Sequence, residues 1–150
     1  MHPATIFHQL HHVCIVVRDI EASVAYYESI GVGPWHEYPS LDQYELKVKD
    51  PRGYLRLRYR YANLANFQLQ LCQPSESDTP QWRFLQDRGQ GVFHLGFTVP
   101  DVDAAERQGL DLGLRLISRG RLPDGTGFTY FDTVGRGASV TLEVRRSELC

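Results

Sequence analysis

The sequence lacks the features that mark membrane, secreted and nucleic-acid-binding proteins. No apolar run approaches the roughly 20 residues that a membrane-spanning helix needs. The first residues, MHPATIFHQLHH, lack the positively charged start and apolar core of a signal peptide. A formal net charge of -2 gives no global basic field that would attract nucleic acid. We therefore expect a cytoplasmic protein that binds neither membranes nor nucleic acid.

Cysteine and lysine are both scarce. The three cysteines, Cys14, Cys72 and Cys150, form no CxxC pair, so the sequence predicts neither a disulfide framework nor a thiolate zinc site. Only Lys47 and Lys49 are lysines among the 16 basic residues. The excess of arginine fits either the recognition of anions by guanidinium groups or the codon bias of a GC-rich genome. Composition therefore indicates a reduced globular protein and leaves the role of the arginines open.

An internal repeat organises the chain. Residues 12–31 align with residues 94–113 without a gap, which places histidine on histidine, aspartate on aspartate and glycine on glycine. The pattern of each copy predicts a strand, then an aspartate N-cap and a helix that ends at a glycine. A chain of 150 residues can bury one core but not two independent ones. The two copies must therefore share a single domain over residues 1–150.

Shorter strands follow each copy, and together they predict an α+β fold of two βαβββ modules. We expect module one over about residues 8–74, a polar linker with a short helical turn over about 75–91, and module two over about 92–146. The expected strands are 10–17, 35–38, 44–48, 54–61 and 66–72, then 93–99, 114–119, 127–132 and 138–145. A turn is expected at 50–53, and the strands after the first helix should form a meander.

Strand periodicity places two polar side chains from each module on one face of the sheet. His12 and His94 lie opposite a uniformly apolar face that should pack under the helices. Gln70 and Glu143 occupy matching positions in the last strands, in the contexts LQL and LEV. A single such residue is usually hydrogen-bonded or solvated. Four of them at equivalent places in a repeat indicate a shared site.

Two imidazoles, one carboxylate and one amide oxygen suit a divalent first-row metal in an open, roughly octahedral site. One carboxylate leaves the ion with a net positive charge, which favours a bound anion such as an enolate. We expect one divalent ion (Co, Mn, Zn, Ni or Fe) on His12, Gln70, His94 and Glu143, with a small-molecule substrate beside it. His11 is an alternative for the first position, although the repeat favours His12.

The chain resembles the vicinal oxygen chelate superfamily of glyoxalases, bleomycin-resistance proteins and dioxygenases. Four stretches carry the resemblance, which covers nearly the whole chain: LHHVCIVVRDIEASVAYYESIGVGP, FQLQLCQP, GVFHLGFTVPDVDAA and SVTLEV. It implies a cup-shaped mixed sheet around one metal, and a homodimer. The same four residues fall on the family's ligand positions. Their order, His, Gln, His, Glu, is most similar to the methylmalonyl-CoA epimerase branch.

That branch implies chemistry through a metal-bound enolate. A carboxylate removes the proton α to a carbonyl, and the metal stabilises the enolate; Glu143 would be ligand and base. A second glutamate serves the branch from the first module. Asp42 and Glu45 are candidates, although residues 41–64 depart from the epimerase pattern. The expected function is an epimerase, an isomerase or a glyoxalase-type lyase.

Two other functions stay open. His12, His94 and Glu143 alone form the 2-His-1-carboxylate set of non-haem iron dioxygenases, but Gln70 would take a position that oxygen and substrate need. A non-catalytic antibiotic-binding protein of the same fold would lack the ligands.

Further side chains allow two interpretations each. The arginines that alternate along the expected strand 54–61 either bind a substrate carboxylate or phosphate or form a solvated face: Arg56, Arg58 and Arg60. Three aromatic residues either line a pocket or pack in the core: Trp35, Phe128 and Tyr130.

Overall fold

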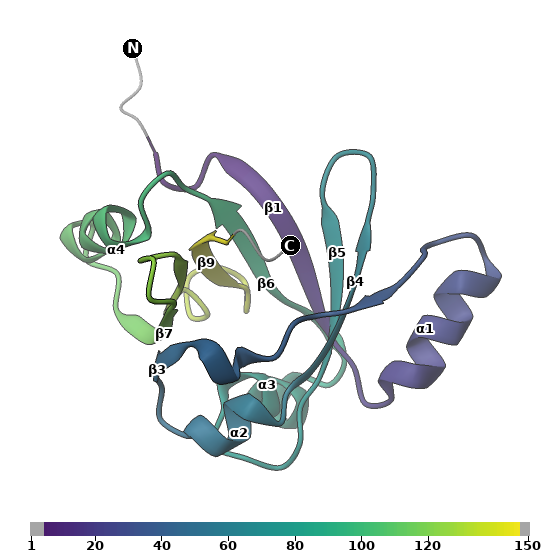
Figure 1. Cartoon of the computed structure of the whole chain (residues 1–150). Helices are drawn as coiled ribbons and strands as arrows, with labels where there is room; N and C mark the ends of the chain where they lie inside the picture. Colours follow the sequence, from purple (N-terminus) through teal and green to yellow (C-terminus); the bar gives the residue numbers. More distant parts are fainter. Residues whose placement is uncertain (1–4, 148–150) are drawn as a thin grey trace.

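A computed structural model describes residues 5–147 (Figure 1). The first half contains β1 (Gln9–Val16), α1 (Ile20–Ser29), β2 (His36–Glu37), a 3-10 turn (Leu41–Gln43), β3 (Glu45–Lys47), α2 (Pro51–Leu55), β4 (Arg58–Asn63) and β5 (Gln68–Gln73). The second contains α3 (Pro80–Arg88), β6 (Gly91–Thr98), α4 (Val102–Asp111), β7 (Leu116–Arg121), β8 (Gly127–Phe131) and β9 (Thr141–Arg146). All nine strands join one curled sheet in the order β2-β4-β5-β1-β6-β9-β8-β7-β3. The expected α+β class is confirmed.

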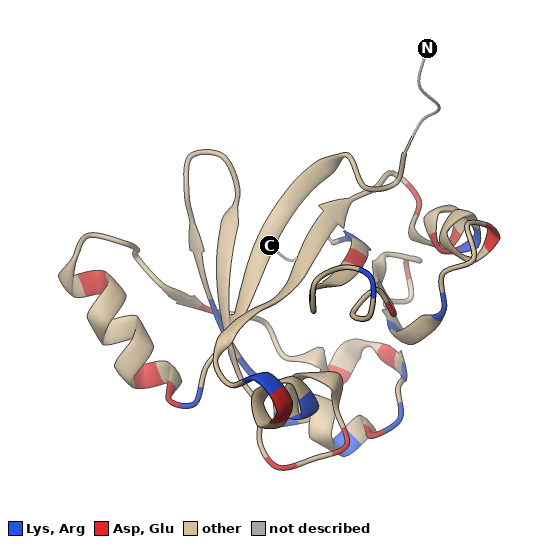
Figure 2. Ribbon diagram, turned by 180° about the vertical axis from the view of Figure 1, so that it is seen from behind, with Lys and Arg blue, Asp and Glu red and all other residues tan. Residues whose placement is uncertain are grey.

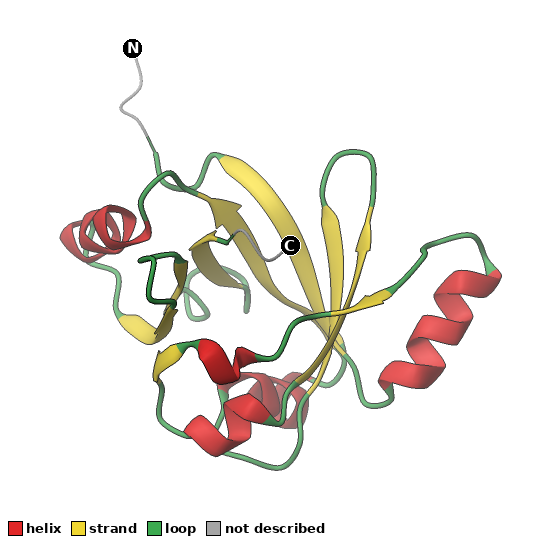
Figure 3. Cartoon of the chain, in the orientation of Figure 1, coloured by secondary structure: helices red, strands yellow, loops and turns green. Residues whose placement is uncertain are grey.

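The two halves meet along β1 and β6, which run antiparallel at the centre of the sheet. Each of these strands pairs in parallel with the last strand of its own half, β5 or β9. The helices α1 and α4 lie far apart at the two ends of the sheet, while α2 and α3 lie together below it (Figure 3). As predicted, Asp19 and Asp101 cap the two repeat helices, accepting from Ala22 N at 3.1 Å and Ala104 N at 3.0 Å.

The prediction for residues 50–57 was wrong, because Pro51–Leu55 form α2 and β4 begins only at Arg58. Asp50 accounts for the difference. Its Oδ1 accepts a hydrogen bond from Gly53 N and its Oδ2 one from Asp78 N, each at 3.0 Å. Pro51 stands in the first turn, where a missing N–H leaves no helical bond unmade. An Asp-Pro pair is a helix-start signal. The alternation of polar and apolar side chains further along the chain nevertheless favoured the prediction of a strand.

The expected meander was also wrong. β3 pairs with β7 of the other half and forms the far edge of the sheet, with Glu45 opposite Arg121. The chain between β2 and β3 therefore crosses over the open side of the curl (Figure 1). This crossing brings Tyr38, Leu41 and Tyr44 to the central cavity.

Two smaller predictions need correction. The expected helical turn in the linker is the longer helix α3, whose Thr79 side chain accepts from Trp82 N at 3.2 Å. The strand expected from residue 138 begins at Thr141. Ala138 and Ser139 have φ values of 56° and 72°, and this left-handed backbone cannot continue a strand.

The arginines of the expected strand 54–61 bind helix α1 or solvent. Arg58 and Arg60 both pair with Glu21 of α1, the latter at 3.0 Å, and Arg60 also lies 3.6 Å from Glu37. Arg56 ends α2 and is exposed. None of the three lines the cavity. Figure 2 shows acidic and basic residues interspersed along the helices and outer strands. Within residues 5–147, no helix has the length and apolarity needed to cross a membrane.

The face of the central strands that carries the histidines is the more deeply buried one, and it holds apolar side chains beside the polar ones. Cys14 and Val16 share the face of His12 and pack with Phe93 and Tyr130 inside the curl. On the opposite face, the residues nearest the helices pack under α1 and α4: Ile15, Val17, Leu71, Val99 and Val144. Val13 and Leu95, cross-strand neighbours between the two helices, are only partly buried.

Candidate metal centre

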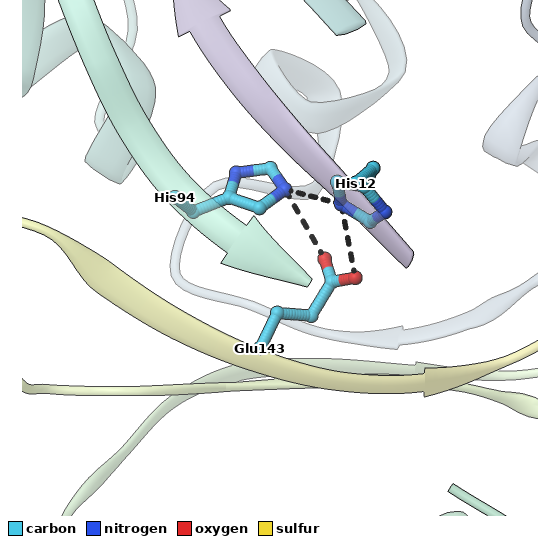
Figure 4. A group of neighbouring side chains, drawn as sticks. All are labelled: His12, His94 and Glu143. Carbon is cyan, nitrogen blue, oxygen red and sulfur yellow. Dashed lines mark hydrogen bonds and ion pairs between the residues drawn. The ribbon is translucent and has the colours of Figure 1, made fainter. Parts of the chain in front are cut away.

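Three of the four predicted ligands converge at the centre of the sheet (Figure 4). Nε2 of His12 lies 2.8 Å from Nε2 of His94. The Glu143 carboxyl oxygens lie 3.4 Å from His12 Nε2 and 3.5 Å from His94 Nε2. Ligand atoms about 2.0–2.1 Å from a shared ion are about 2.8–3.4 Å apart at octahedral to tetrahedral angles. The three side chains, all at most 5% exposed, could therefore hold a divalent ion.

The pairing of β1 with β6 makes room for the two imidazoles. His12 lies opposite Gly96, and His94 lies opposite Cys14. A Cβ added at Gly96 would come within 2.7 Å of His12 Nδ1 and closer still to the ring atoms Cε1 and Nε2. The His12 ring thus fills the space that a side chain at residue 96 would need.

His11, the alternative first ligand, lies behind His12 and outside the three-residue group. A register shift between Leu10 and His12 marks a β-bulge, which turns neighbouring residues out of strict alternation. His11 Nδ1 lies 2.7 Å from His12 Nδ1. To bind an ion through Nε2, His12 must carry its ring proton on Nδ1. That proton is then donated to His11 Nδ1. Hydrogen bonds of this kind fix the tautomer and the ring orientation of ligand histidines in many metal sites. The adjacent histidines were visible in the sequence, but the bulge was not.

Replacing His11 with alanine is expected to weaken metal binding about 10- to 100-fold, the usual effect of losing an outer hydrogen-bond partner. His11→Asn keeps an acceptor oxygen and should lose less. Competition titration against a chromogenic chelator measures both. The exposed His36 supplies the matched control, His36→Ala, which should bind like the parent protein. Equal losses in His11→Ala and His11→Asn would argue against the hydrogen-bonding role.

Burial keeps the imidazoles neutral and the carboxyl protonated in the metal-free protein. Burial lowers the pKa of His94 to about 3 and holds that of His12 well below its usual value. It raises the pKa of Glu143 to about 8, against the opposing effects of Arg145 and of a hydrogen bond with Tyr130. An ion needs neutral imidazoles and an ionised carboxylate, so only Glu143 has to release a proton on binding.

We expect the metal-free protein to be most stable near pH 6.5 and to lose about 1 kcal/mol of unfolding free energy by pH 8. Between these pH values Glu143 is ionised in the unfolded chain, whereas in the folded protein Glu143 keeps its proton up to about pH 8. The folded state then binds more protons, so stability falls as pH rises. Below about pH 6.5 the sign reverses, because the unfolded chain protonates His11, His12 and His94, whereas burial lowers the pKa of all three in the folded protein.

Denaturant titrations in chelator across this pH range measure the effect. The matched variant Glu143→Gln should remove the loss above pH 6.5, and so should a bound metal ion, since the carboxylate is then ionised in the folded state. A loss of the same size in Glu143→Gln would assign it to another group.

Gln70, the fourth predicted ligand, lines the same cavity as His12 and Glu143. Its Nε2 donates to Gln68 Oε1 at 2.7 Å, and Gln68 Nε2 donates to Asn63 Oδ1 at 3.1 Å. This chain of amides leaves the Gln70 oxygen as the atom available to a cation. The contribution of Gln68 and Asn63 was not predicted, since Gln68 looked like an ordinary polar strand residue and Asn63 was expected in the connection between the strands 54–61 and 66–72.

The cavity beside these ligands has a volume of about 40 Å³, counted as the space open to the centre of a water molecule. Its walls are mostly aromatic: Tyr38, Tyr44, Tyr54, Tyr59, Phe128 and Tyr130. Tyr130 hydrogen-bonds to Glu143 and to Tyr59, whose hydroxyl also accepts from Gln81 at 3.1 Å. Phe128 and Tyr130 thus belong to the pocket. Trp35 packs under α1 instead.

The two candidates for a second carboxylate base lie away from this cavity. Asp42 and Glu45 are exposed, and their segment reaches the cavity through Leu41 and Tyr44. Within residues 5–147, Glu143 is the one carboxylate that lines it.

The chain is similar to known proteins over most of its length. Residues 11–131 match the model of the Glyoxalase/Bleomycin resistance protein/Dioxygenase superfamily. Human mitochondrial methylmalonyl-CoA epimerase is 29% identical over 98 residues, which are 65% of this chain and 49% of that protein. The chain therefore spans about half the length of this curated relative.

Solved structures of bacterial epimerases are among those that share the fold. Methylmalonyl-CoA epimerase from Mycobacterium tuberculosis has 24% identity and a TM-score of 0.71, covering 97% of this chain and 91% of that one. A Streptomyces coelicolor methylmalonyl-CoA epimerase bound to 2-nitronate-propionyl-CoA has 23% identity and a TM-score of 0.71, covering 95% and 99%. With the family model matching most of its residues, the chain belongs to the glyoxalase/bleomycin resistance protein/dioxygenase superfamily.

Proposed function

We propose that this protein is an enzyme that depends on a divalent metal and removes the proton α to a carbonyl of a small carbonyl or acyl substrate. The observation that carries the proposal is the convergence of His12, His94 and Glu143 on one buried cavity that Gln70 also lines. These four residues hold the ion, which when bound supplies Lewis acidity to the substrate carbonyl. The identity of the metal, among Co, Mn, Zn, Ni and Fe, is left to experiment.

Glu143 is the base in this proposal. It is the one carboxylate among residues 5–147 that lines the cavity, so it is the group placed to accept the proton. Its carboxyl group also hydrogen-bonds with Tyr130, which lines the same cavity. The aromatic walls keep bulk water from the site, and their hydroxyls can donate to a developing enolate oxygen.

The single carboxylate in the cavity favours proton removal and return on one face of the substrate, as in an isomerase or a lyase. The relatives named above are epimerases, and inversion of a centre calls for proton delivery on both faces. Among the described residues that line the cavity, tyrosine and serine hydroxyls are candidates to act on the second face.

The test is solvent deuterium exchange. Protein loaded with each of the five ions is incubated in D2O with the separate enantiomers of 2-methylmalonyl-CoA and with an α-hydroxyketone panel. We expect exchange into one enantiomer without inversion or oxygen uptake, and none in Glu143→Gln. Inversion as fast as exchange would indicate an epimerase, and oxygen uptake with iron would indicate a dioxygenase. No exchange with any substrate would contradict the proposal.

We also propose a homodimer formed through the outer face between α1 and α4. There Val13 and Leu95 are partly buried and Val92 is 41% exposed. An isologous dimer packs the same patch of two copies against each other, and these partly exposed apolar residues on neighbouring strands form such a patch. Light scattering should give twice the chain mass, and Val92→Glu should give the monomer; a parent protein that is monomeric at micromolar concentration would contradict this.

A further inference from the structure

The two ligand histidines differ in what lies behind their rings. In both imidazoles Nε2 faces Glu143, so Nδ1 is the nitrogen turned away from the proposed ion (Figure 4). Nδ1 of His12 lies 2.7 Å from Nδ1 of His11. Nδ1 of His94 is buried and has no hydrogen-bond partner among residues 5–147. Within the described part of the chain, the outer contact that His12 makes is therefore missing for His94.

A second buried polar atom without a partner lies beside the His94 ring. Thr141 on β9 is the Cα partner of His94 in the parallel pair of β6 and β9, and neighbouring strands are about 4.8 Å apart. Thr141 lies two residues before Glu143, so its side chain shares the inner face of the sheet with both ligands. It is 1% exposed, and its Oγ1 has no hydrogen-bond partner among the described residues. The two unpaired groups thus belong to neighbouring side chains.

Metal binding leaves a proton on His94 Nδ1 that needs an acceptor. In the metal-free protein one of the two Nε2 atoms, 2.8 Å apart, must carry the proton of their hydrogen bond. An ion requires both Nε2 atoms to be bare, so the one proton of each neutral ring is then on Nδ1. A buried N–H group without an acceptor is strongly unfavourable. The rings of Phe93 and Tyr130, which pack on the imidazole, supply no oxygen to it through these contacts.

We propose that the Thr141 hydroxyl accepts the Nδ1 proton of His94 in the metal-loaded protein and so fixes the tautomer and the orientation of this ligand. The inference rests on the metal site of the proposed function. A change of the Thr141 side chain between staggered positions moves the hydroxyl and leaves the backbone in place. Cys14, the cross-strand partner of His94 on its other side, offers a sulfur, which is a weak acceptor. Thr141 is therefore a positioning residue, which acts through His94.

The test compares Zn2+ affinity in matched variants, by competition titration against a chromogenic chelator. Thr141→Val removes the hydroxyl and keeps the shape of the side chain, and it should weaken binding about 10- to 100-fold. Thr141→Ser keeps a hydroxyl and should stay within about 3-fold of the parent protein, as should Cys14→Ala.

The control for the loss of a buried hydroxyl lies on the neighbouring strand β8. Thr129 is fully buried, and its Oγ1 donates to Glu106 Oε1 at 2.8 Å. Thr129→Val should therefore lower the denaturant midpoint of the metal-free protein and leave Zn2+ affinity unchanged. Thr141→Val should do the reverse, because the Thr141 hydroxyl makes no hydrogen bond in the metal-free protein.

Nuclear magnetic resonance of the Zn2+-loaded parent protein with 15N-labelled histidine gives a direct signature. We expect the His94 ring proton on Nδ1, slow to exchange with solvent and close to the Thr141 side chain in Overhauser spectra. In Thr141→Val this proton should exchange faster, whereas a role in packing alone would leave its exchange unchanged.

Equal losses of affinity in Thr141→Val and Thr141→Ser would assign the effect to packing and overturn the inference, as would unchanged affinity in Thr141→Val. A loss in Cys14→Ala as large as that in Thr141→Val would also overturn it. If Thr141→Val does not fold, the parent spectrum decides: a slowly exchanging Nδ1 proton beside Thr141 supports the inference, and a rapidly exchanging one overturns it. A parent protein that binds no Zn2+ would overturn it together with the proposed site. A selective effect of Thr141 in a protein that exchanges no α proton would refute the proposed function and leave the role of Thr141 intact.

Discussion

Replacing His94 with alanine is expected to weaken divalent-metal binding at least about 100-fold and to abolish metal-dependent activity. The His94 Nε2 atom lies 2.8 Å from His12 Nε2 and 3.5 Å from the Glu143 carboxyl. Removing the imidazole therefore removes one of the four proposed metal ligands. A tightly bound structural ion contributes about 10–16 kcal/mol, and one ligand in four accounts for about 3 kcal/mol of that. Equilibrium dialysis with metal analysis measures the change.

The control is a histidine outside the site. His36→Ala removes an exposed imidazole from β2 and should bind metal like the parent protein. Circular dichroism must show that His94→Ala remains folded, because the ring packs 5.0 Å from Tyr130 and 5.3 Å from Phe93. A folded His94→Ala protein that retains metal at full affinity would rule out the proposed ligand set.

The repeat and the strand period were enough to predict which residues meet at the centre. A period of two assigns alternate residues to one face, and the repeat places His12 and His94 on strands equivalent in the two halves. Once β1 and β6 pair, the two side chains are brought together whatever the loops do. The same reasoning put Glu143 on the inner face of β9, where the structure has it.

Features that depend on contacts between distant elements could not be predicted. The pairing of β3 with β7 depends on the route of the chain across the curl, which no local pattern specifies. The partner of Arg58 and Arg60 is Glu21, whose distance from them follows from how α1 packs on β4. The displacement of His11 from strict alternation comes from a register shift between β1 and β6. A register shift of one residue cannot be predicted from the local sequence.

Glycine at position 96 is another such feature. In the repeat alignment it matches Cys14, and nothing in the sequence indicates that a side chain is excluded there. The structure supplies the reason: residue 96 lies opposite His12, and the imidazole covers its Cα. The two histidines therefore have unequal surroundings, His94 beside a cysteine and His12 beside bare backbone.

Gly96→Ala is accordingly expected to weaken metal binding about as much as the loss of a ligand, at least about 100-fold. The new methyl group would overlap the His12 ring, and the ring is the part able to move, because residue 96 is fixed by the central strands on both sides. Such overpacking also destabilises the fold by about 1–3 kcal/mol. Gly91→Ala provides the control in the same strand, since a Cβ there meets nothing within 4 Å. If Gly96→Ala bound metal as well as Gly91→Ala, the His12 ring would not be held where the proposed site requires it.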